Sequence, residues 1–553
     1  MPNQGLSWMS ASCLLACLVV AACEDPWRGR GAGELAARAG GLVPPPVAAA
    51  AAYRTVGLGT LGGPASAAVD LNAAGQVIGD STPPGSLEQH AFLWHHGIMT
   101  DLGTLGGQSS HAADINAAGQ IAGDSHPPGD STSFFDLHAF LWQDGTMVDL
   151  GTLGGTGSYA IGINAAGQVV GYSYLPGGNT SHHAFLWQDG AMVDLGTLGG
   201  PSSYPTSINA SGQVVGWAHL PDHSQHAFLW QNGAMVDLGT LGGSQSYATD
   251  INAAGQVIGY SQLPGNLAYA PFLWQDGSMT SLGSLGGTFS WPTDINAAGQ
   301  VVGFSYLPNN SSYHAFFWQS GEMVDLGTLG GSSSLAAGIN AAGQIIGNSF
   351  LADNATERAF LWKDGVMVDL GTLGADWSFA YAINDLGQGA GFSADGVHPY
   401  AHAVLWTPGG CTTQVTVGPV VQLWPPDHAM RSFRLSDCAS AGDSCGGSVD
   451  IDARGTITSI FSDEPEDAAG AGDGHTVGDI AITGTSSFSL RSERQGRGNG
   501  RVYGVSFAVT DGDGTTTQTA TCHFAVPRDR SGSSAVNDGA SSGYTVNCLR
   551  PQP

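Results

Sequence analysis

The hydrophobic and polar positions of this chain follow one pattern that recurs eight times between residues 53 and 407. One unit contains four short apolar segments that alternate like half-buried strands: SYATDIN (246–252), QVIGYS (256–261), a third ending in PFLW (271–274), and SMTSLGSL (278–285). Asn-Ala-Ala-Gly joins the first two and Gln-Asp-Gly the last two, and both are tight-turn signals. Helical periodicity is absent from the repeat. Each unit therefore predicts four antiparallel strands, named a to d.

The spacing of the units predicts the architecture. Tryptophans of the HAFLW box recur every 43 to 48 residues, at Trp94, Trp142, Trp187, Trp230, Trp274, Trp318, Trp362 and Trp406. Four antiparallel strands per repeat of about 44 residues are typical of a β-propeller blade. The alternative is a β-helix, whose coils need about 20 to 30 residues and fewer hairpin turns.

The two ends of the array complement each other. YRTVGLGTL (53–61) is a strand d with no strand c before it, and the last unit stops after HAVLW (402–406) with no strand d behind it. Many propellers close their ring by letting an early strand complete the last blade, which removes exposed sheet edges. The sequence therefore predicts an all-β chain with an eight-bladed propeller over residues 53–407.

Comparison of the units separates constant turns from variable loops. In an up-and-down blade the a–b and c–d turns share one face, and the b–c and d–a loops share the other. The b–c loops vary most, so we expect the ligand face there. Aromatic residues follow the LGG box by four positions in five units, at Tyr159, Tyr204, Tyr247, Trp291 and Phe379. They are expected around the mouth of a central channel, binding sugar rings or a peptide. Packing between blades is the alternative.

Polar residues of the constant boxes are interpreted as structural. The box histidines are His90, His138, His183, His226, His314 and His402. Two units have Ala270 and Arg358 instead, and Ser281 replaces the aspartate of the VDLGT box once, so no shared metal or catalytic task is expected. No catalytic motif is recognisable. An enzyme would require residues of the variable loops to converge, for instance Asp136, His219, Asp222 and His223.

The repeat ends near Cys411, where the composition changes. Segments 415–424, 448–461, 479–490 and 501–527 alternate like the strands of a sandwich. Five cysteines lie in this region: Cys411, Cys438, Cys445, Cys522 and Cys548. They allow two disulfides and one free thiol, and the pairings considered are Cys438 with Cys445, and Cys411 with Cys522 or Cys548. Asp463, Glu464 and Asp473 form an acidic loop that suits Ca²⁺, with a solvated loop as the alternative.

Two resemblances bear on these domains. The HAFLW, INAAGQ and GLGTLGG boxes, recurring in that order, resemble the HAF repeat family of bacterial extracellular proteins. That family implies location and supplies no catalytic residue. The strings LWPPDH and CHFAVP, with the glycine- and arginine-rich stretch between them, resemble an immunoglobulin-like module of bacterial surface proteins. This resemblance implies an immunoglobulin-like sandwich over residues 408–528, with a role in adhesion or spacing, and a flexible tail at 529–553.

The N-terminus predicts export. Residues 13–22 are apolar but too few to span a bilayer, and they suit a signal peptide. LVVAAC resembles the lipobox of bacterial lipoproteins, which implies a signal at 1–22 and lipidation of Cys23. MPNQGLSWMS contains no Lys or Arg, which departs from the usual n-region. The alternative is an ordinary secretory signal with an incidental cysteine. Residues 23–52 are rich in Gly, Ala and Pro and are expected to be a flexible tether.

Charge excludes several partners. The chain has a net charge of −29, and residues 55–357 contain 21 Asp and Glu but no Lys or Arg. Nucleic acid is therefore excluded, and a membrane is met only through the lipid anchor. We expect a monomeric, non-enzymatic lipoprotein on the outer bacterial surface that binds an extracellular polysaccharide or protein, without a cofactor unless Ca²⁺ binds. The alternatives are a polysaccharide hydrolase or lyase and a structural envelope protein.

Overall fold

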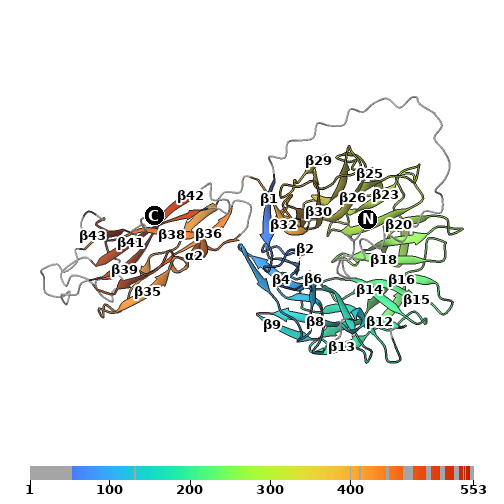
Figure 1. The fold of residues 1–553 in the computed structure, drawn as a ribbon, viewed down its shortest axis with the longest axis horizontal. Helices are drawn as coiled ribbons and strands as arrows, with labels where there is room; N and C mark the ends of the chain where they lie inside the picture. The colour runs from blue at the N-terminus through green and yellow to red at the C-terminus, as the bar shows by residue number, and fades with distance from the viewer. Residues whose placement is uncertain are drawn as a thin grey trace. The chain divides into compact units, whose positions relative to one another are not determined.

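The computed structural model describes residues 53–547 except 87, 130–132, 179, 399, 410–412, 444–447, 465–477, 494–499, 511–516, 528–534, 540 and 542. The chain divides after Gly409 into two compact units, which are described separately. Regular secondary structure in the described residues is almost entirely β-strand (Figure 1). No helix in the part of the chain that the structure describes has the length and hydropathy needed to span a bilayer.

In the first unit, the described residues form eight four-stranded antiparallel sheets. The a strands are β2 (Ser66–Leu71), β6 (Ser110–Ile115), β10 (Ser158–Ile163), β14 (Ser203–Ile208), β18 (Ser246–Ile251), β22 (Ser290–Ile295), β26 (Gly330–Ile339) and β30 (Ser378–Ile383). The b strands are β3 (Val77–Ser81), β7 (Ile121–Ser125), β11 (Val169–Tyr174), β15 (Val214–His219), β19 (Val257–Gln262), β23 (Val301–Tyr306), β27 (Ile345–Leu351) and β31 (Gly389–Ala394).

The c strands carry the HAFLW box. They are β4 (His90–His95), β8 (His138–Gln143), β12 (His182–Gln188), β16 (Gln225–Gln231), β20 (Tyr269–Gln275), β24 (Tyr313–Gln319), β28 (Glu357–Lys363) and β32 (Ala401–Pro408). The d strands of seven sheets are β5 (Ile98–Asp101), β9 (Thr146–Asp149), β13 (Ala191–Asp194), β17 (Ala234–Asp237), β21 (Ser278–Ser281), β25 (Glu322–Asp325) and β29 (Val366–Asp369). The strands within each sheet pair antiparallel, in contrast to the parallel coils of a β-helix.

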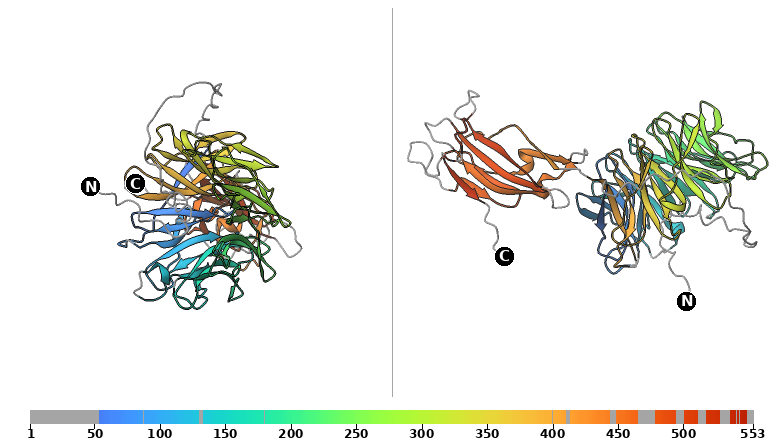
Figure 2. Two further views of the ribbon diagram at one scale, coloured as in Figure 1. Left: turned by 90° about the vertical axis from the view of Figure 1, so that its right-hand side faces the viewer. Right: turned by 90° about the horizontal axis from the view of Figure 1, so that it is seen from above.

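The eighth sheet takes its fourth strand from the beginning of the array. β1 (Tyr53–Gly59) pairs antiparallel with β32, with Tyr53 opposite Pro408 and Val56 opposite Leu405. Figure 1 shows β1, in blue, beside the orange β32, and Figure 2 shows the unit from two further sides. The a strands of consecutive sheets contact one another in order from β2 to β30, and β30 contacts β2. The sheets thus follow one another in a cycle, which is a β-propeller-like arrangement.

The apolar core of this unit lies between neighbouring sheets. In one cluster, Leu141 and Leu150 of the second sheet pack with Ile163 and Phe185 of the third. A corresponding cluster joins Leu58 and Leu405 of the eighth sheet to residues of the first. The phenylalanine of the HAF box is completely buried in seven sheets. Its constancy reflects this packing, because a side chain of another size would leave a void or a clash.

The asparagine of the NAAGQ box links each sheet to the next. Asn252 Oδ1 accepts hydrogen bonds from the N–H groups of Ala254 and Gln256 at 3.0 and 3.1 Å. Its Nδ2 donates to Gln256 Oε1 at 2.7 Å and to the backbone carbonyl of Asn296 in the following sheet at 3.1 Å. All eight asparagines repeat this pattern, and Asn384 of the last sheet donates to the carbonyl of Asn72 in the first, at 3.0 Å. The hydrogen-bonded chain is therefore closed.

The described part of the second unit contains three sheets. A five-stranded sheet has the order β34 (Val421–Gln422), β42 (Thr517–Val526), β41 (Arg501–Thr510), β38 (Gly455–Ser462) and β43 (Tyr544–Asn547). One three-stranded sheet comprises β33 (Thr413–Val417), β36 (Ala439–Asp443) and β37 (Ser448–Val449). The other comprises β35 (Met430–Arg434), β40 (Ser487–Arg491) and β39 (Ile480–Ile482). Two single-turn helices, η3 (Leu435–Asp437) and α2 (Ile451–Arg454), connect strands.

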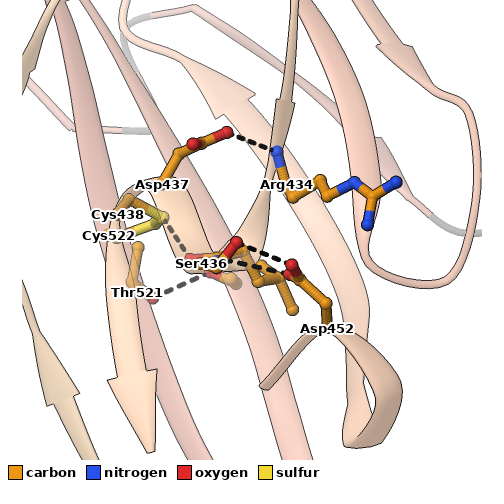
Figure 3. The surroundings of a disulfide bond; sticks show 9 residues. Arg434, Ser436, Asp437, Cys438, Asp452, Thr521 and Cys522 are labelled. Carbon is orange, nitrogen blue, oxygen red and sulfur yellow. Dashed lines mark hydrogen bonds between the residues drawn. A yellow bond between two sulfur atoms is a disulfide. The ribbon is translucent and has the colours of Figure 1, made fainter. Parts of the chain in front are cut away.

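Two expectations for this unit are corrected. Cys438 forms a disulfide with Cys522 and not with Cys445, joining the residue after η3 to β42 across 84 positions of sequence (Figure 3). Both cysteines are buried in the core of the unit, where the folded sheets bring them together. Residues 544–547, expected in the flexible tail, form β43 and pair with β38. Cys411, Cys445 and Cys548 lie outside the described residues.

Candidate functional site

Four b–c loops of the first unit are described at every residue. In each of these a residue occupies the left-handed region: His223, Asn266, Asn310 and Asn354. The three asparagine side chains reach the d–a loop of their own unit, accepting hydrogen bonds from the N–H groups of Ser244, Thr288 and Ser332 at 2.6 to 3.0 Å. The two loop types therefore lie side by side, and the variable loops are held on a fixed base.

Glycine is required where these loops meet. Gly154 of the LGG box has φ +97°, and a Cβ there would lie 3.1 Å from Cγ of Pro176 in the b–c loop. The same close approach joins Gly286 to Pro308, at 2.8 Å. Only a residue without a side chain combines this backbone conformation with this contact. The LGG box thus supports the variable loop that follows it.

Large exposed apolar side chains mark the b–c loops. Phe135, in the 3₁₀ turn η2 (Phe134–Asp136), is 48% exposed, and Leu267 is 90% exposed. Val397 and Tyr400, in the loop between β31 and β32, are 80% and 43% exposed. In the described part of the first unit, every other large apolar side chain this exposed lies on an outer d strand. Exposed apolar groups of this kind are candidates for contact with a ligand.

The five aromatic residues predicted at the ligand site are largely engaged with one another. Each stands at the start of an a strand and pairs across the sheet with a residue of strand b, as Tyr159 does with Tyr172 and Tyr204 with Trp217. The ring centroids of these pairs are 4.8 and 5.6 Å apart. Tyr247 stacks on Tyr260 and Phe379 on Phe392, while Trp291 is paired with Phe304.

Stacking also continues from sheet to sheet. Tyr172 lies 4.8 Å from Tyr204, and Tyr260 stacks on Trp291 at 4.0 Å. Burial raises the pKa of Tyr204 and raises that of Tyr247 to about 12. Tyr204 has a ring on each side, so a ligand would meet its edge rather than its face. The loop residues described above offer more accessible apolar surface than these five.

Sequence reasoning missed the b-strand partners of these residues. They follow the glycine of the QVxG pattern: Asp80, Asp124, Tyr172, Trp217, Tyr260, Phe304, Asn348 and Phe392. This position varies between units, as the aromatic position at the start of strand a does. That variation was a sequence signal that could have identified these residues. Two neighbouring units carry aspartate here, Asp80 and Asp124. Polar side chains therefore replace aromatic ones in these two units.

A partly buried histidine, His111, and two buried carboxyl groups form the polar sector of these two units. His111 Nδ1 lies 3.2 Å from Asp80 Oδ2, and the other oxygen of Asp80 accepts the N–H of Ala112 at 3.0 Å. Burial raises the pKa of Asp124 to about 7, and its Oδ1 has no hydrogen-bond partner among the described residues. Burial lowers the pKa of His111, but the carboxylate of Asp80 outweighs it and the pKa rises to about 9. A carboxyl group that titrates near neutrality is a candidate proton donor or acceptor.

The four residues named for an enzymatic site are placed differently. His219 belongs to strand β15, while Asp222 and His223 belong to the loop that follows it, where Asp222 binds the hydroxyl of Ser224 at 2.6 Å. Asp136 lies in η2, in a unit two sheets earlier. Within the described residues, the three-membered cluster of metal-binding side chains is Asp395, His398 and His402, and it includes none of these four.

Histidines of the HAF box pair with aspartates of strand d. His138 Nδ1 lies 2.9 Å from Asp149 Oδ2, and His314 Nδ1 lies 2.8 Å from Asp325 Oδ1. The same pair occurs in three further sheets, at His90–Asp101, His183–Asp194 and His226–Asp237. One histidine and one carboxylate are too few for a metal site. These pairs hold the end of strand c to strand d.

A second acidic feature lies on the a strands. Four aspartates directly precede the isoleucine or leucine of the INAAGQ box: Asp70, Asp114, Asp250 and Asp294. Each accepts a hydrogen bond, at 2.8 to 3.3 Å, from the N–H of the box isoleucine in the next sheet. Burial, with the adjacent Asp250 carboxylate, raises the pKa of Asp294 to about 8. Burial also raises the pKa of Asp70 and of Asp114. These carboxyl groups link neighbouring sheets.

The acidic loop of the second unit has protein partners. Asp463 accepts the N–H of Val502 at 2.7 Å, and Glu464 Oε2 lies 3.2 Å from Arg501 Nε. Arg501 is 1% exposed and also contacts Asp479. Asp473, the third residue of the predicted calcium site, lies outside the described residues, as does Cys23. Glu464 is thus paired with Arg501, and Asp463 accepts hydrogen bonds from backbone N–H groups.

The fold and these loops define a class: an all-β, β-propeller-like repeat protein with a separate β-domain. No family model and no curated protein sequence matches the chain. Among solved structures, TolB from Acinetobacter baumannii is 13% identical, with 53% of this chain and 64% of that chain covered and a TM-score of 0.29. Dipeptidyl peptidase 4 from Porphyromonas gingivalis is 8% identical, with 60% and 56% covered and a TM-score of 0.42. The Aleuria aurantia lectin is 12% identical, with 47% and 95% covered and a TM-score of 0.24. The chain covers less than two thirds of the first two, and similarity this distant carries no argument about function.

Proposed function

We propose that the first unit is a closed eight-bladed propeller and the second an immunoglobulin-like sandwich. The pairing of β1 with β32 and the closed chain of eight asparagines support the first assignment. Facing β-sheets around a disulfide-linked apolar core support the second. Both remain consistent with membership of the HAF repeat family.

The protein is then a non-enzymatic, lipid-anchored surface protein that binds an extracellular polysaccharide or protein through its b–c loops. The observation that carries this proposal is the exposure of Phe135, Leu267, Val397 and Tyr400 on loops of one kind. The ligand chemistry follows from charge: without Lys or Arg between residues 55 and 357, this surface favours neutral glycans or basic protein segments over anions.

Ligand binding is tested with the full chain on arrays of neutral and acidic polysaccharides and on basic peptides. Changing Leu267 or Tyr400 to alanine should weaken binding about tenfold, because exposed apolar residues often dominate an interface. Val193→Ala is the matched control, since Val193 is 46% exposed but lies on an outer strand. Equal binding by all variants would contradict the proposed face. No binding by the wild-type protein would favour the structural envelope role.

Lipid anchoring is tested separately. Cys23→Ser should release the protein from the cell surface into the medium, whereas an ordinary secretory signal would leave the location unchanged. Mass spectrometry of the N-terminal peptide distinguishes a lipidated Cys23 from a free one.

An enzymatic function is the second candidate, and Asp124 is the observation in its favour. Its pKa of about 7 and its position beside His111 and Tyr159 suit a proton donor or acceptor. Release of reducing ends from a polysaccharide by the wild-type protein, lost in Asp124→Asn, would establish hydrolysis or elimination. Binding without any release would leave the non-enzymatic proposal standing.

A further inference from the structure

The loop between β31 and β32 brings together three metal-binding side chains. Asp395, His398 and His402 each place one ligand atom so that all three atoms lie within 4.8 Å of one another. His398 Nδ1 is 2.7 Å, and His402 Nδ1 is 3.5 Å, from the same oxygen of Asp395. No other group of this kind occurs among the residues that the structure describes.

His402 occupies the HAF-box position but has lost the usual partner. In a complete unit the aspartate of strand d stands opposite the box phenylalanine, as Asp149 stands opposite Phe140. The eighth sheet takes β1 as its strand d, and there Gly57 stands opposite Val404. No carboxylate is therefore available on strand d, and the imidazole of His402 faces Asp395 instead.

Hydrogen bonds around the cluster orient its ligands. His402 Nε2 lies 3.2 Å from the carbonyl oxygen of Pro64, which can only accept, so Nε2 carries the proton. In the neutral ring Nδ1 is then unprotonated and points its lone pair at a carboxylate oxygen. Asp395 is itself held by its second oxygen, which accepts the N–H groups of Val397 and His398 at 2.9 and 2.8 Å. Ligating histidines typically donate their other nitrogen to a carbonyl in this way.

We propose that Asp395, His398 and His402 bind a divalent transition-metal ion, with Zn²⁺ as the reference ion. Two imidazoles and one carboxylate suit Zn²⁺, Ni²⁺ or Cu²⁺, whereas Ca²⁺ and Mg²⁺ take oxygen ligands almost exclusively. Three protein ligands leave at least one coordination position open. His398 is 57% exposed and Asp395 17%, so an ion can enter from solvent. This inference stands on the cluster itself and does not depend on the proposed ligand face.

Isothermal titration of the full chain, without a histidine tag, with ZnCl₂ tests the site. One Zn²⁺ per chain should bind, and His398→Ala should weaken its affinity at least tenfold. His314→Ala is the matched control, since His314 has the HAF-box position of another sheet and pairs only with Asp325. Its affinity for Zn²⁺ should equal that of the wild type.

The thermal midpoint gives an independent readout, because an ion that binds only the folded protein raises it. ZnCl₂ should raise the midpoint of the wild type and of His314→Ala but not that of His398→Ala. The proposal is overturned if the wild type binds no Zn²⁺ at micromolar concentrations. It is also overturned if His398→Ala binds Zn²⁺ as tightly as the wild type does.

Discussion

At the scale of single residues, the constant letters of the repeat correspond to specific hydrogen bonds. The histidine of the HAF box and the aspartate of strand d bind each other in five sheets. They also change together: the fifth unit has Ala270 and Ser281, and the seventh keeps an ion pair between Arg358 and Asp369 at 3.6 Å. A comparison of the repeat units could therefore have predicted that the box histidine pairs with the aspartate of strand d. Each of the two positions by itself indicated only a structural role.

The asparagine chain yields a first prediction. Asn252→Ala removes four hydrogen bonds, including the buried one that the carbonyl of Asn296 accepts from the neighbouring sheet. We expect the free energy of unfolding to fall by about 2–4 kcal/mol, measured by urea denaturation. Ala254→Ser is the control, because the fourth unit carries Ser211 at that position. A loss below about 0.5 kcal/mol would contradict the importance assigned to this contact.

The buried cation of the second unit yields a second prediction. Arg501→Met leaves Glu464 and Asp479 without their shared partner, so the unit should lose about 3–5 kcal/mol of stability. Arg431→Met breaks the surface pair with Asp427 and should cost at most about 1 kcal/mol. The two variants are compared by denaturation followed by far-ultraviolet circular dichroism. Equal losses in both would show that burial of Arg501 is energetically unimportant.

At the scale of elements, the strand that completes the eighth sheet is the most consequential. β1 covers the edge of β32, and Leu58 packs with residues of the first and eighth sheets. Its place was predictable because the array begins with a strand d and ends with a strand c. The b–c loops were predictable as variable segments, but their conformations were not, since Asn266 and its equivalents bind loops about 20 residues away in the chain.

Removal of that strand is the third prediction. A chain beginning at residue 60 exposes the edge of β32 and should aggregate or unfold at a lower temperature than a chain beginning at Tyr53. The chain from Tyr53 is the control, because it keeps β1 and lacks only the residues before it. Light scattering and the thermal midpoint measure the difference. Identical behaviour of the two chains would argue against closure by β1.

At the scale of the whole molecule, acidic groups outnumber basic ones by 45 to 16, and several carboxyl groups are buried. Burial raises the pKa of Asp294 to about 8 and that of Asp124 to about 7. These groups bind protons more tightly in the folded than in the unfolded chain, where aspartate titrates near 4. Stability therefore falls as pH rises from about 4 to about 8. Asp149 acts oppositely: burial raises its pKa, but hydrogen bonds from His138 and Gly151 lower it overall.

The fourth prediction concerns this pH dependence. The thermal midpoint should be higher near pH 5 than at pH 8, and it should fall again below about pH 4, where carboxylates such as Asp149 lose their partners. Asp294→Asn keeps the hydrogen-bonding shape without the charge, so it should raise the midpoint at pH 8 by at least about 2 °C. At pH 5 the gain should be smaller. A wild-type midpoint that rises from pH 5 to pH 8 would contradict the buried carboxyl assignment.

The sequence by itself determined the strands, their turns and the number of repeats. Period-two alternation and turn residues act over a few positions. The strands of a unit such as 246–285 can therefore be predicted from that unit alone. It also indicated that constant letters report packing, as the buried box phenylalanines and the asparagine chain illustrate.

Only the tertiary structure decided which distant residues meet. The disulfide between Cys438 and Cys522 joins residues 84 positions apart. The ring of Tyr204, which the sequence predicted to bind a ligand, packs between Tyr172 and Trp217 instead. His402 faces Asp395 because Gly57, from the other end of the repeat array, occupies the position at which other sheets have an aspartate. Such contacts depend on how whole sheets are arranged, and no local pattern of residues encodes them.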